Sequence, residues 1–366
     1  MADAAVARLR LIRTTGVGPV TYRQLLARFG SADAAIDALP MLAARGGGGR
    51  SPVVPDERTI AREMAATARA GARYLFLDDA DYPVLLAEIE NAPPALIVRG
   101  DVALANGRPC IALVGARNAS AAACRFAREI AHDLVAGGAS VVSGLARGID
   151  TAAHHGSVGT PERPGATIGV IAGGIDIAYP PDNADLQDMV ATRGLLVAEQ
   201  PPGIEPRARH FPYRNRIIAG LSLGTVVVEA VQKSGSLITA RLAGEMGREV
   251  MAVPGSPLDP RAQGGNMLIR EGATLVQSAA DILEQVRPID ARAVRSPGAR
   301  FDGPPPEDAS DADRRRVVAL LGPVPCGVDE LIRQSGLSSP IVQIILLELE
   351  LAGRIERHAG GRVSLG

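Results

Sequence analysis

The chain has 366 residues, 46% of them hydrophobic, which is enough to bury the cores of two or three domains. Its formal net charge of −1 excludes the global positive field that draws many proteins to nucleic acid, so any polyanion site must be local. The three cysteines have no spacing typical of a zinc site, and no apolar run approaches the ~18 residues of a membrane span, so we expect a cytoplasmic protein without bound metal or membrane contact.

Residues 1–70 carry four helical patterns, which predict a small helical N-terminal domain. The first two patterns are joined by TTGVGP at 14–19. A Gly-Val-Gly turn between helices points backbone N–H groups outward, so it is able to hold a phosphate, as in helix-hairpin-helix or SAM-like modules. A plain helix–helix turn is the alternative. RGGGGRSPVVP at 45–55 predicts a flexible loop.

Residues 71–287 alternate apolar strands with amphipathic helices. The strands are continuous apolar runs rather than alternating ones, which indicates burial on both faces. Strand–helix–strand repetition predicts an α/β core, an extended Rossmann-like, doubly wound parallel sheet. The predicted strands lie at 111–115, 140–144, 167–174, 195–199, 225–230, 249–253 and 273–277.

A stretch rich in Pro, Gly and charge at 288–312 predicts a linker. Residues 313–366 then show three helices and a hairpin that turns at Gly360–Gly361, the outline of a winged-helix domain. In a sequence-specific member the third helix reads DNA. Here this helix carries Glu348 and Glu350 and no basic residue before Arg354, so we expect a protein-contact or regulatory role.

Glycines, small polar residues and cations follow five of the predicted strands. Open parallel sheets bind ligands at these carboxyl ends, where glycine amides and helix N-termini favour anions. Ser234 or Ser236 is also placed to cap the helix that follows. The sequence therefore predicts a phosphate-binding surface. Its candidate residues are Gly115, Arg117, Ser143, Gly144, Arg147, Gly173, Gly174, Lys233, Ser234 and Ser236.

The sequences of the same loops argue against two common kinds of nucleotide-binding site. G-x-G-x-x-G is absent after the first strand of the core, and G-x-x-x-x-G-K-[ST] occurs nowhere in the chain. These absences argue against NAD and against a P-loop ATPase, and we expect no cofactor.

The stretch EPRARHFPYRNRIIAG at 205–220 places Phe211 among arginines, including Arg209, Arg214 and Arg216. Aromatic platforms beside cations are typical of single-stranded nucleic acid binding, where each stacked base contributes ~1–3 kcal/mol. Two alternatives stay open. Phe211 is otherwise a core residue, and Arg216 is otherwise an ion-pair partner of Glu199 or Glu229 in the core.

Other polar residues suggest catalysis only weakly. Asp150 and His154 are four residues apart on one predicted helix face, as an acid–base pair or two metal ligands would be, but no third ligand is spaced nearby. We favour a helix-capping Asp with a hydrogen-bonded His. Glu199 and Glu229 end buried strands, where holding arginines is the alternative to catalysis. No nucleophile motif is present, so we expect no enzyme.

Six stretches in order give the chain a resemblance to the DNA-processing protein A (DprA/Smf) family, over about residues 72–280. They are IALVGARNAS, VVSGLARGIDTAAH, TIGVIAGGIDIAYPPDN, AEQPPGIEPRARHFPYRNRIIAGLS, VVVEAVQKSGSLITARLAGEMGREVMAVPG and GGNMLIREGATLV. The resemblance implies a core that binds single-stranded DNA and forms a homodimer. It also implies that the protein shields incoming DNA from nucleases and loads RecA onto it during natural transformation.

The resemblance also assigns residues. The family's Gly-Ser-Arg loop corresponds to residues 115–117, and its SGLARGID loop corresponds to residues 143–150. Its FPxRNR segment corresponds to residues 211–216, which include Asn215, and its KSGSLITA segment corresponds to residues 233–240. Ala116 replaces the usual serine, Tyr213 stands where a basic residue is common, and Arg207 and Arg209 take over a basic position before the FP pair. These departures concern individual phosphate contacts rather than the class of ligand.

The rival hypothesis is an enzyme. Related Rossmann-like proteins hydrolyse nucleoside monophosphates at the same sheet edge with a glycine-rich loop near a glutamate, and Glu229 is the residue we would nominate here. The expected P-G-G-x-G-T loop is absent, because AVQKSGSLITA takes its place.

Overall fold

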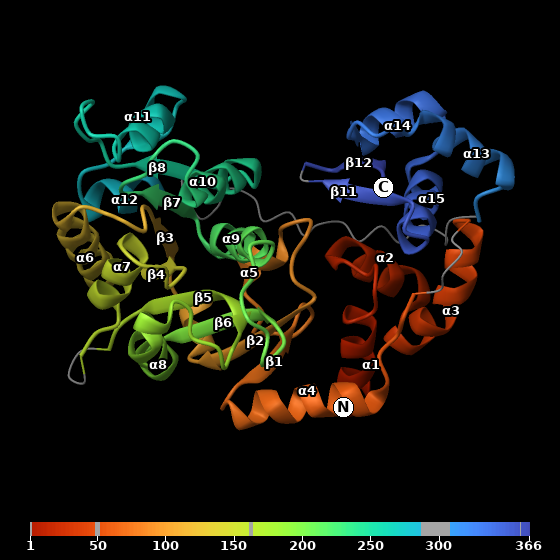
Figure 1. The fold of residues 1–366 in the computed structure, drawn as a ribbon, viewed down its shortest axis with the longest axis horizontal. Helices are drawn as coiled ribbons and strands as arrows, with labels where there is room; N and C mark the ends of the chain where they lie inside the picture. Colours follow the sequence, from red (N-terminus) through yellow and green to blue (C-terminus); the bar gives the residue numbers. More distant parts are fainter. Residues whose placement is uncertain (1, 48–51, 161–163, 287–307, 359) are drawn as a thin grey trace. The chain divides into compact units, whose positions relative to one another are not determined.

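The structure is a computed structural model that describes residues 2–47, 52–160, 164–286, 308–358 and 360–366 (Figure 1). The chain divides into two compact units, one formed by residues 1–62 and 294–366 and the other by residues 63–293. Most of the predicted linker at 288–312 lies outside the described residues, as does the centre of the glycine-rich loop at 45–55. The predicted domain limits near 70, 287 and 313 stay predictions.

The larger unit is built on one nine-stranded sheet. The seven strands from β3 to β9 pair in parallel, which confirms the predicted doubly wound sheet. Two further strands, β1 and β2, were not predicted, and they pair antiparallel at one edge. In sheet order the strands are β1 (Arg73–Phe76), β2 (Ala95–Gly100), β6 (Leu195–Gln200), β5 (Thr167–Gly174), β4 (Ser140–Ser143), β3 (Cys110–Val114), β7 (Gly224–Val227), β8 (Glu249–Ala252) and β9 (Thr274–Leu275).

Strand β3 shows why the central strands read as continuous apolar runs. Its alternate residues point to opposite faces, so Ile111 and Leu113 join the core on one face while Cys110, Ala112 and Val114 join the core on the other. All five residues are buried. A strand covered by helices on both sides needs apolar side chains at every position.

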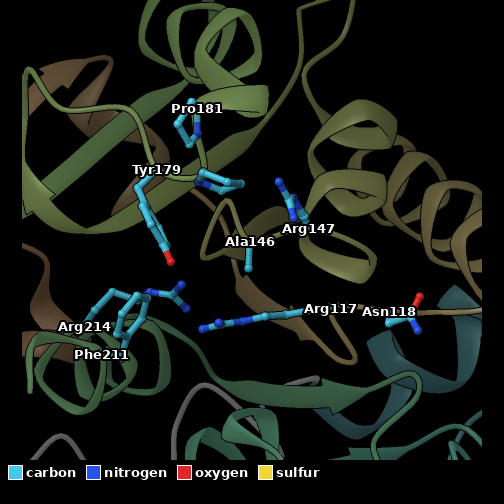
Figure 2. A pocket seen from close by; sticks show the side chains of 9 residues that line it. Arg117, Asn118, Ala146, Arg147, Tyr179, Pro181, Phe211 and Arg214 are labelled. Carbon is cyan, nitrogen blue, oxygen red and sulfur yellow. The ribbon is translucent and has the colours of Figure 1, made fainter. Parts of the chain in front are cut away.

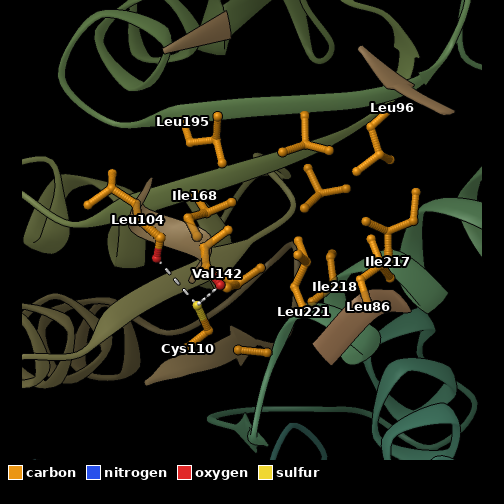
Figure 3. Close-up of a cluster of buried hydrophobic side chains, with 14 of the residues drawn as sticks. Leu86, Leu96, Leu104, Cys110, Val142, Ile168, Leu195, Ile217, Ile218 and Leu221 are labelled. Atoms are coloured by element: carbon orange, nitrogen blue, oxygen red, sulfur yellow. Dashed lines mark hydrogen bonds between the residues drawn. The ribbon is translucent and has the colours of Figure 1, made fainter. Parts of the chain in front are cut away.

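Helices cover both faces of the sheet. One face packs against α6 (Ala121–Ala136), α7 (Ile149–Ser157), α8 (Ala184–Arg193) and α12 (Ala279–Val286). The other packs against α5 (Val84–Ala87), α9 (His210–Leu221) and α10 (Gly235–Glu245). Figure 3 shows this second core, which includes Leu96 of β2, Leu195 of β6 and Ile217, Ile218 and Leu221 of α9. The short elements η1 (Val102–Ala105), η2 (Pro181–Asn183) and α11 (Gln263–Arg270) complete the unit.

The strand order places a topological switch at the centre of the sheet. From β3 the chain builds β4, β5 and β6 on one side, and it then returns to build β7, β8 and β9 on the other side. Neighbouring loops therefore leave in opposite directions between β3 and β7, which opens a crevice at their carboxyl ends. Doubly wound sheets bind ligands in such a crevice.

The smaller unit combines the helical N-terminal segment with a winged helix, and both were predicted. The segment contains α1 (Ala2–Ile12), α2 (Pro19–Phe29) and α3 (Ala32–Arg45), and α4 (Glu57–Arg69) contains the division between the units. The winged helix contains α13 (Asp311–Leu320), α14 (Val328–Ser335) and α15 (Ser339–Leu351). Its three-stranded sheet adds an unpredicted β10 (Cys326–Gly327) to the hairpin of β11 (Ile355–His358) and β12 (Arg362–Leu365).

Helix α15 is buried by both parts of the smaller unit. Its residues pack into the winged-helix core, while Leu347 and Leu351 join the core of α1, α2 and α3. Glu348 is fully buried and accepts two hydrogen bonds from Arg314, at 2.7 and 3.0 Å. Glu350 accepts a hydrogen bond of 2.7 Å from the Thr21 hydroxyl. The two carboxylates of the third helix are therefore held by partners within this unit.

No helix in the part of the chain that the structure describes is both long and apolar enough to cross a membrane.

Candidate functional site

Two adjoining cavities lie at the carboxyl ends of the central strands. The first, here called the ring cavity, has a volume of about 450 Å³. The second, the loop cavity, has a volume of about 560 Å³. The residues shared by both are Arg117, Asn118, Ala146, Phe211 and Arg214. The ring cavity adds Arg147, Tyr179, Pro180 and Pro181. The loop cavity adds residues that include Gly115 after β3, Asn215 of α9, Ser234, Gly235 and Ser236 after β7, and Arg261 after β8.

Phe211 stands at the junction of the two cavities, in the first turn of α9. It is half-buried, and the Arg117 guanidinium carbon lies 5.2 Å from the centre of its ring. Figure 2 shows the Arg117 side chain extended across the cavity toward Phe211. The ring of Tyr179 lies 5.9 Å away, tilted by 59°. One cation and two rings, from two loops and the start of α9, therefore face the same space, and cations beside aromatic rings are typical of sites for a stacked base and its phosphate.

Arg214 lies beside Phe211 at this junction and is almost completely buried. Its Nη2 donates to the Gly144 carbonyl at 2.9 Å, and its guanidinium carbon lies 5.8 Å from the Phe211 ring centre. A Cβ on Gly144 would overlap this guanidinium, so the loop needs glycine there. Asp150 lies 4.0 Å from Arg214 and accepts backbone hydrogen bonds from Gly144 and Ala146. Burial raises the pKa of Asp150 and lowers that of Arg214, and each charge opposes the shift of the other.

Gly148 lets the loops after β3 and β4 pack together. Its φ is +77°, and a Cβ there would overlap the carbonyl of Ala116. The next amide, that of Ile149, donates to the same carbonyl at 3.3 Å. The loops that carry Arg117 and Arg147 are therefore held side by side. Arg147 is exposed and forms an ion pair with Asp182 at 2.6 Å.

The N-terminus of α10 forms one wall of the loop cavity. Ser234 occupies the N-cap position without a side-chain capping bond; its hydroxyl lies 2.5 Å from the hydroxyl of Ser236 instead. Lys233, just before it, is exposed at a φ of +66° and lines neither cavity. The amides of this turn and the positive end of the helix dipole favour an anion in the cavity.

Four predicted contact residues support the fold away from the cavities. The Ser143 hydroxyl donates to the Leu113 carbonyl at 2.6 Å. Gly173 and Gly174 lie under the loop at 201–206, where side chains would overlap its backbone. Arg216 is buried, donates to the Asn91 carbonyl at 2.6 Å, and forms an ion pair with Glu199. The structure thus supports the alternative interpretation of Arg216 as an ion-pair partner.

Two further predicted residues flank the junction on α9. Asn215 is buried, accepts a hydrogen bond from Arg214 at 3.3 Å and donates one to the Gly235 carbonyl at 3.4 Å, so it connects α9 to the first residue of α10. Arg209 is exposed, and its Nε lies 3.4 Å from the Nε2 of His210. Tyr213 points elsewhere, with 52% of its surface exposed and its ring 5.9 Å from Arg216.

The residues considered for catalysis have structural partners. The buried His154 pairs its Nδ1 with the Thr167 hydroxyl at 2.7 Å, and burial lowers the pKa of His154 to about 3. Glu229 accepts from the backbone N–H and the hydroxyl of Ser120, at 2.9 and 2.7 Å, and so holds the start of α6. Within the described ranges, no group of His, Cys, Asp and Glu is arranged to hold a metal ion.

Tyr179 is the main residue that the sequence reading missed. It lies in AYPPDN, in the loop that follows β5, and is 45% exposed. A ring held between a strand end and two prolines is a recognisable signal, because prolines stiffen the turn that presents it. The cations and glycines could be predicted because they follow strand ends. The ring of Tyr179 could not, because it lies on a loop whose path the sequence does not reveal.

Three sequence models of known families match the chain. The model described as DNA recombination-mediator protein A matches residues 73–287. A DprA-like N-terminal HHH domain matches residues 2–66, and a DprA winged-helix domain matches residues 302–361. Together the three matches cover the greater part of the chain in order.

Named relatives show the same likeness. The DNA processing protein DprA of Bacillus subtilis is 42% identical over 227 residues, which cover 62% of this chain and 75% of that protein. Protein Smf of Synechocystis is 33% identical over 384 aligned residues, with 95% of each chain covered.

Solved structures resemble the fold as well. The X-ray structure of DNA processing protein A from Streptococcus pneumoniae has a TM-score of 0.64 and 35% identity, covering 78% of this chain and 98% of that one. DNA processing protein A from Helicobacter pylori, described with a unique single-stranded DNA binding mode, has a TM-score of 0.53 and 25% identity. That match covers 59% of this chain and 97% of the other.

Proposed function

The chain belongs to the DNA recombination-mediator protein A family, and from this premise we propose that it binds single-stranded DNA at the ring and loop cavities. The observation that carries the proposal is the contact between Arg117 and Phe211, 5.2 Å apart where the two cavities meet. A phosphate binds the guanidinium and an unpaired base stacks on a ring, so the junction takes one nucleotide by both of its parts.

The shape of the site favours a single strand over a duplex. Two connected cavities of about 450 and 560 Å³ accept bases that have left a helix, whereas a duplex presents its phosphates outside and its bases stacked. The likeness to the Helicobacter pylori protein, which is described with a single-stranded DNA binding mode, supports the same choice.

A salt titration tests the proposal. Fluorescence anisotropy of a labelled oligothymidylate is measured at two salt concentrations, and binding must weaken steeply as salt rises, because each neutralised phosphate releases counterions. Arg117→Ala is expected to weaken binding uniformly across sequences and to reduce the salt slope by about one. Arg270→Ala is the matched control, since Arg270 is exposed on α11 and lines neither cavity. Salt-insensitive binding, or an unchanged Arg117→Ala variant, contradicts the assignment.

We further propose that the bound strand is protected from nucleases and delivered to RecA during natural transformation, in the cytoplasm and by a homodimer. The family assignment supports this role, because a recombination mediator must hold a strand and pass it on. Light scattering of the purified chain tests the dimer. Nuclease protection and RecA filament growth on a coated strand test the role, and Arg117→Ala must lose both.

The alternative, hydrolysis of nucleoside monophosphates, is favoured by one observation: the loop cavity lies at the topological switch and has the size of a nucleotide pocket. Against it, both oxygens of Glu229 accept hydrogen bonds from Ser120. We therefore propose a non-catalytic protein. Release of free base from any nucleoside monophosphate incubated with the pure protein would contradict this choice.

A further inference from the structure

A third cavity lies in the smaller unit, between the C-terminal end of α3, one side of α13 and the second half of α15. It has a volume of about 350 Å³, and we call it the arginine cavity because four arginines line it: Arg45, Arg314, Arg315 and Arg354. These residues come from the helical N-terminal segment and from the winged helix, which belong to the same compact unit.

The four arginines are not equivalent. Arg314 is bound to Glu348 and Asp311, and Arg45 shares Asp308 with Arg28, so both have carboxylate partners. Arg315 and Arg354 have no carboxylate partner among the residues that the structure describes, and both are exposed. Arg354 donates one hydrogen bond, to the Gly46 carbonyl at 3.2 Å. Two uncompensated guanidinium groups therefore stand at the rim of the cavity.

The floor of the arginine cavity is aliphatic. It is formed by Val318, Ala319, Ile345 and Leu349. No aromatic residue lines this cavity, in contrast to the ring cavity with Tyr179 and Phe211. A nucleobase would find no ring on which to stack, whereas an apolar side chain would find a floor of its own polarity.

The walls are fixed by close packing. A Cβ on Gly46 would overlap the Glu348 carbonyl, so the end of α3 touches the backbone of α15. Glu348 is fully buried beneath Arg314, and Leu347 continues the contact into the core of the N-terminal helices. The cavity is therefore preformed, and a ligand need not order its walls on binding.

We propose that the arginine cavity is a docking site for an acidic peptide segment of a partner protein. One apolar side chain of the peptide occupies the aliphatic floor, and flanking carboxylates pair with Arg315 and Arg354. Guanidinium groups bind carboxylates through paired N–H donors, which gives such a contact its direction. The smaller unit thus recruits a protein, while the larger unit holds DNA.

The test uses the full chain and three fluorescein-labelled pentapeptides, each with alternating aspartate and glutamate followed by leucine, isoleucine or phenylalanine. At low salt, anisotropy is expected to show a Kd on the order of 100 µM for at least one peptide. The double variant Arg315→Glu with Arg354→Glu is expected to weaken that binding about 10-fold or more, through lost pairing and new repulsion. Replacing the apolar residue of the peptide by alanine is expected to abolish it.

Two further variants distinguish binding in the cavity from a general effect of the protein's charge. Arg316→Glu, at an exposed residue of the same helix that does not line the cavity, makes the charge change of one of the two substitutions and must leave peptide binding nearly unchanged. Ala319→Leu fills the floor without altering charge and must weaken binding, with the melting temperature confirming that it folds.

Three results would overturn the proposal. The first is no binding of any of the three peptides below ~1 mM. The second is equal binding by the double variant and the unaltered chain. The third is a loss of oligothymidylate affinity in the double variant as large as that of Arg117→Ala, which would make the cavity a nucleic-acid site instead.

Discussion

The rings of Tyr179 and Phe211 come from separate segments of the chain and contact each other in the ring cavity, with their centres 5.9 Å apart and tilted by 59°. A bound base would therefore lie against this pair of rings rather than between them. If Tyr179 contacts that base, Tyr179→Ala is expected to weaken oligothymidylate binding by about 1–3 kcal/mol, roughly 5- to 150-fold in Kd. Anisotropy at fixed salt measures the change. The salt slope must stay the same, because the substitution removes no cation.

Tyr213 supplies the control for this substitution. It lies on the same helix as Phe211 and is more exposed than Tyr179, but it lines neither cavity. Tyr213→Ala is expected to leave affinity nearly unchanged. Equal losses for the two tyrosines would mean that stacking occurs on the outer face of α9 rather than in the cavity.

His154 makes stability depend on pH. Its pKa falls from 6.5 to about 3 on folding, because burial disfavours the charged ring. Below pH 6.5 the His154 ring of the unfolded chain takes up a proton, whereas the ring of the folded chain stays neutral until the pH approaches 3. The contribution of the neutral ring to the free energy of unfolding is therefore fully present above pH 6.5 and is lost as the pH falls toward 3. Between pH 7 and pH 5 the free energy of unfolding is expected to drop by about 2 kcal/mol from this group.

Urea unfolding of the His154→Asn variant measures that contribution. The variant is expected to be less stable overall, but its stability should fall less between pH 7 and pH 5. Asp150, with its raised pKa, acts in the opposite direction in both proteins and cancels in the comparison. His132→Asn, at an exposed position, should keep the pH dependence of the unaltered chain; an identical slope for His154→Asn would show that this ring is not buried neutral.

Individual side chains mark the limit of what the sequence allowed us to predict. Arg117 was predictable, because a cation after a central strand reaches the sheet edge whatever the packing around it. Arg214 and Arg216 were predicted from the cluster of arginines around Phe211, yet both are buried, since the helix turns them toward Gly144 and Glu199. Which side of a helix faces the core depends on neighbours that the local sequence does not name.

The loops after β3 and β4 act as one element, because Gly148 allows them to touch. Gly148→Ala is expected to cost about 2 kcal/mol or more, from the positive φ and from overlap with the Ala116 carbonyl. It should also weaken DNA binding, since the loops of Arg117 and Arg147 must separate. Thermal unfolding and anisotropy measure the two effects.

A second glycine, Gly138, allows the effect of backbone strain to be measured without the effect of steric overlap. Gly138 has a φ of +89°, but a Cβ there meets nothing within 4 Å. Gly138→Ala should therefore lose only about 1 kcal/mol through its backbone and should bind DNA normally. If both variants bind DNA alike, the contact between the loops does not position the arginines.

Strand prediction succeeded where both faces are covered. The runs that became β3, β4, β5 and β7 are buried at every position, because helices cover both of their sides. β1 was missed since its RYLF sequence begins with an exposed arginine and spans four residues at the edge. β2 is apolar, but its antiparallel direction follows from its partners rather than from its own residues.

Both cavities proposed for DNA lie within the larger unit. A fragment of residues 63–286 is therefore expected to fold, to unfold in one transition and to bind oligothymidylate with the salt slope of the full chain. Circular dichroism and anisotropy on the fragment provide the measurement. A folded fragment with more than about 10-fold weaker binding would place part of the DNA site in the smaller unit.

The division of the molecule into two units could be predicted only in part from its sequence. Composition showed where ordered segments give way to proline and glycine, and periodicity showed a helical start, an α/β middle and a winged-helix end. It did not show that the first and last segments share a core, because Leu347 and Leu351 meet the N-terminal helices across about 300 residues of chain. Contacts this distant in sequence leave no local pattern.

Lys233 is the only lysine in the chain, and it is exposed beside the turn that opens α10. Reagents that acylate side-chain amines consequently have a single side-chain target in this protein. A dye attached there would sit next to the loop cavity without any engineered cysteine. The chain's preference for arginine thus leaves one natural handle through which occupancy of the site becomes visible.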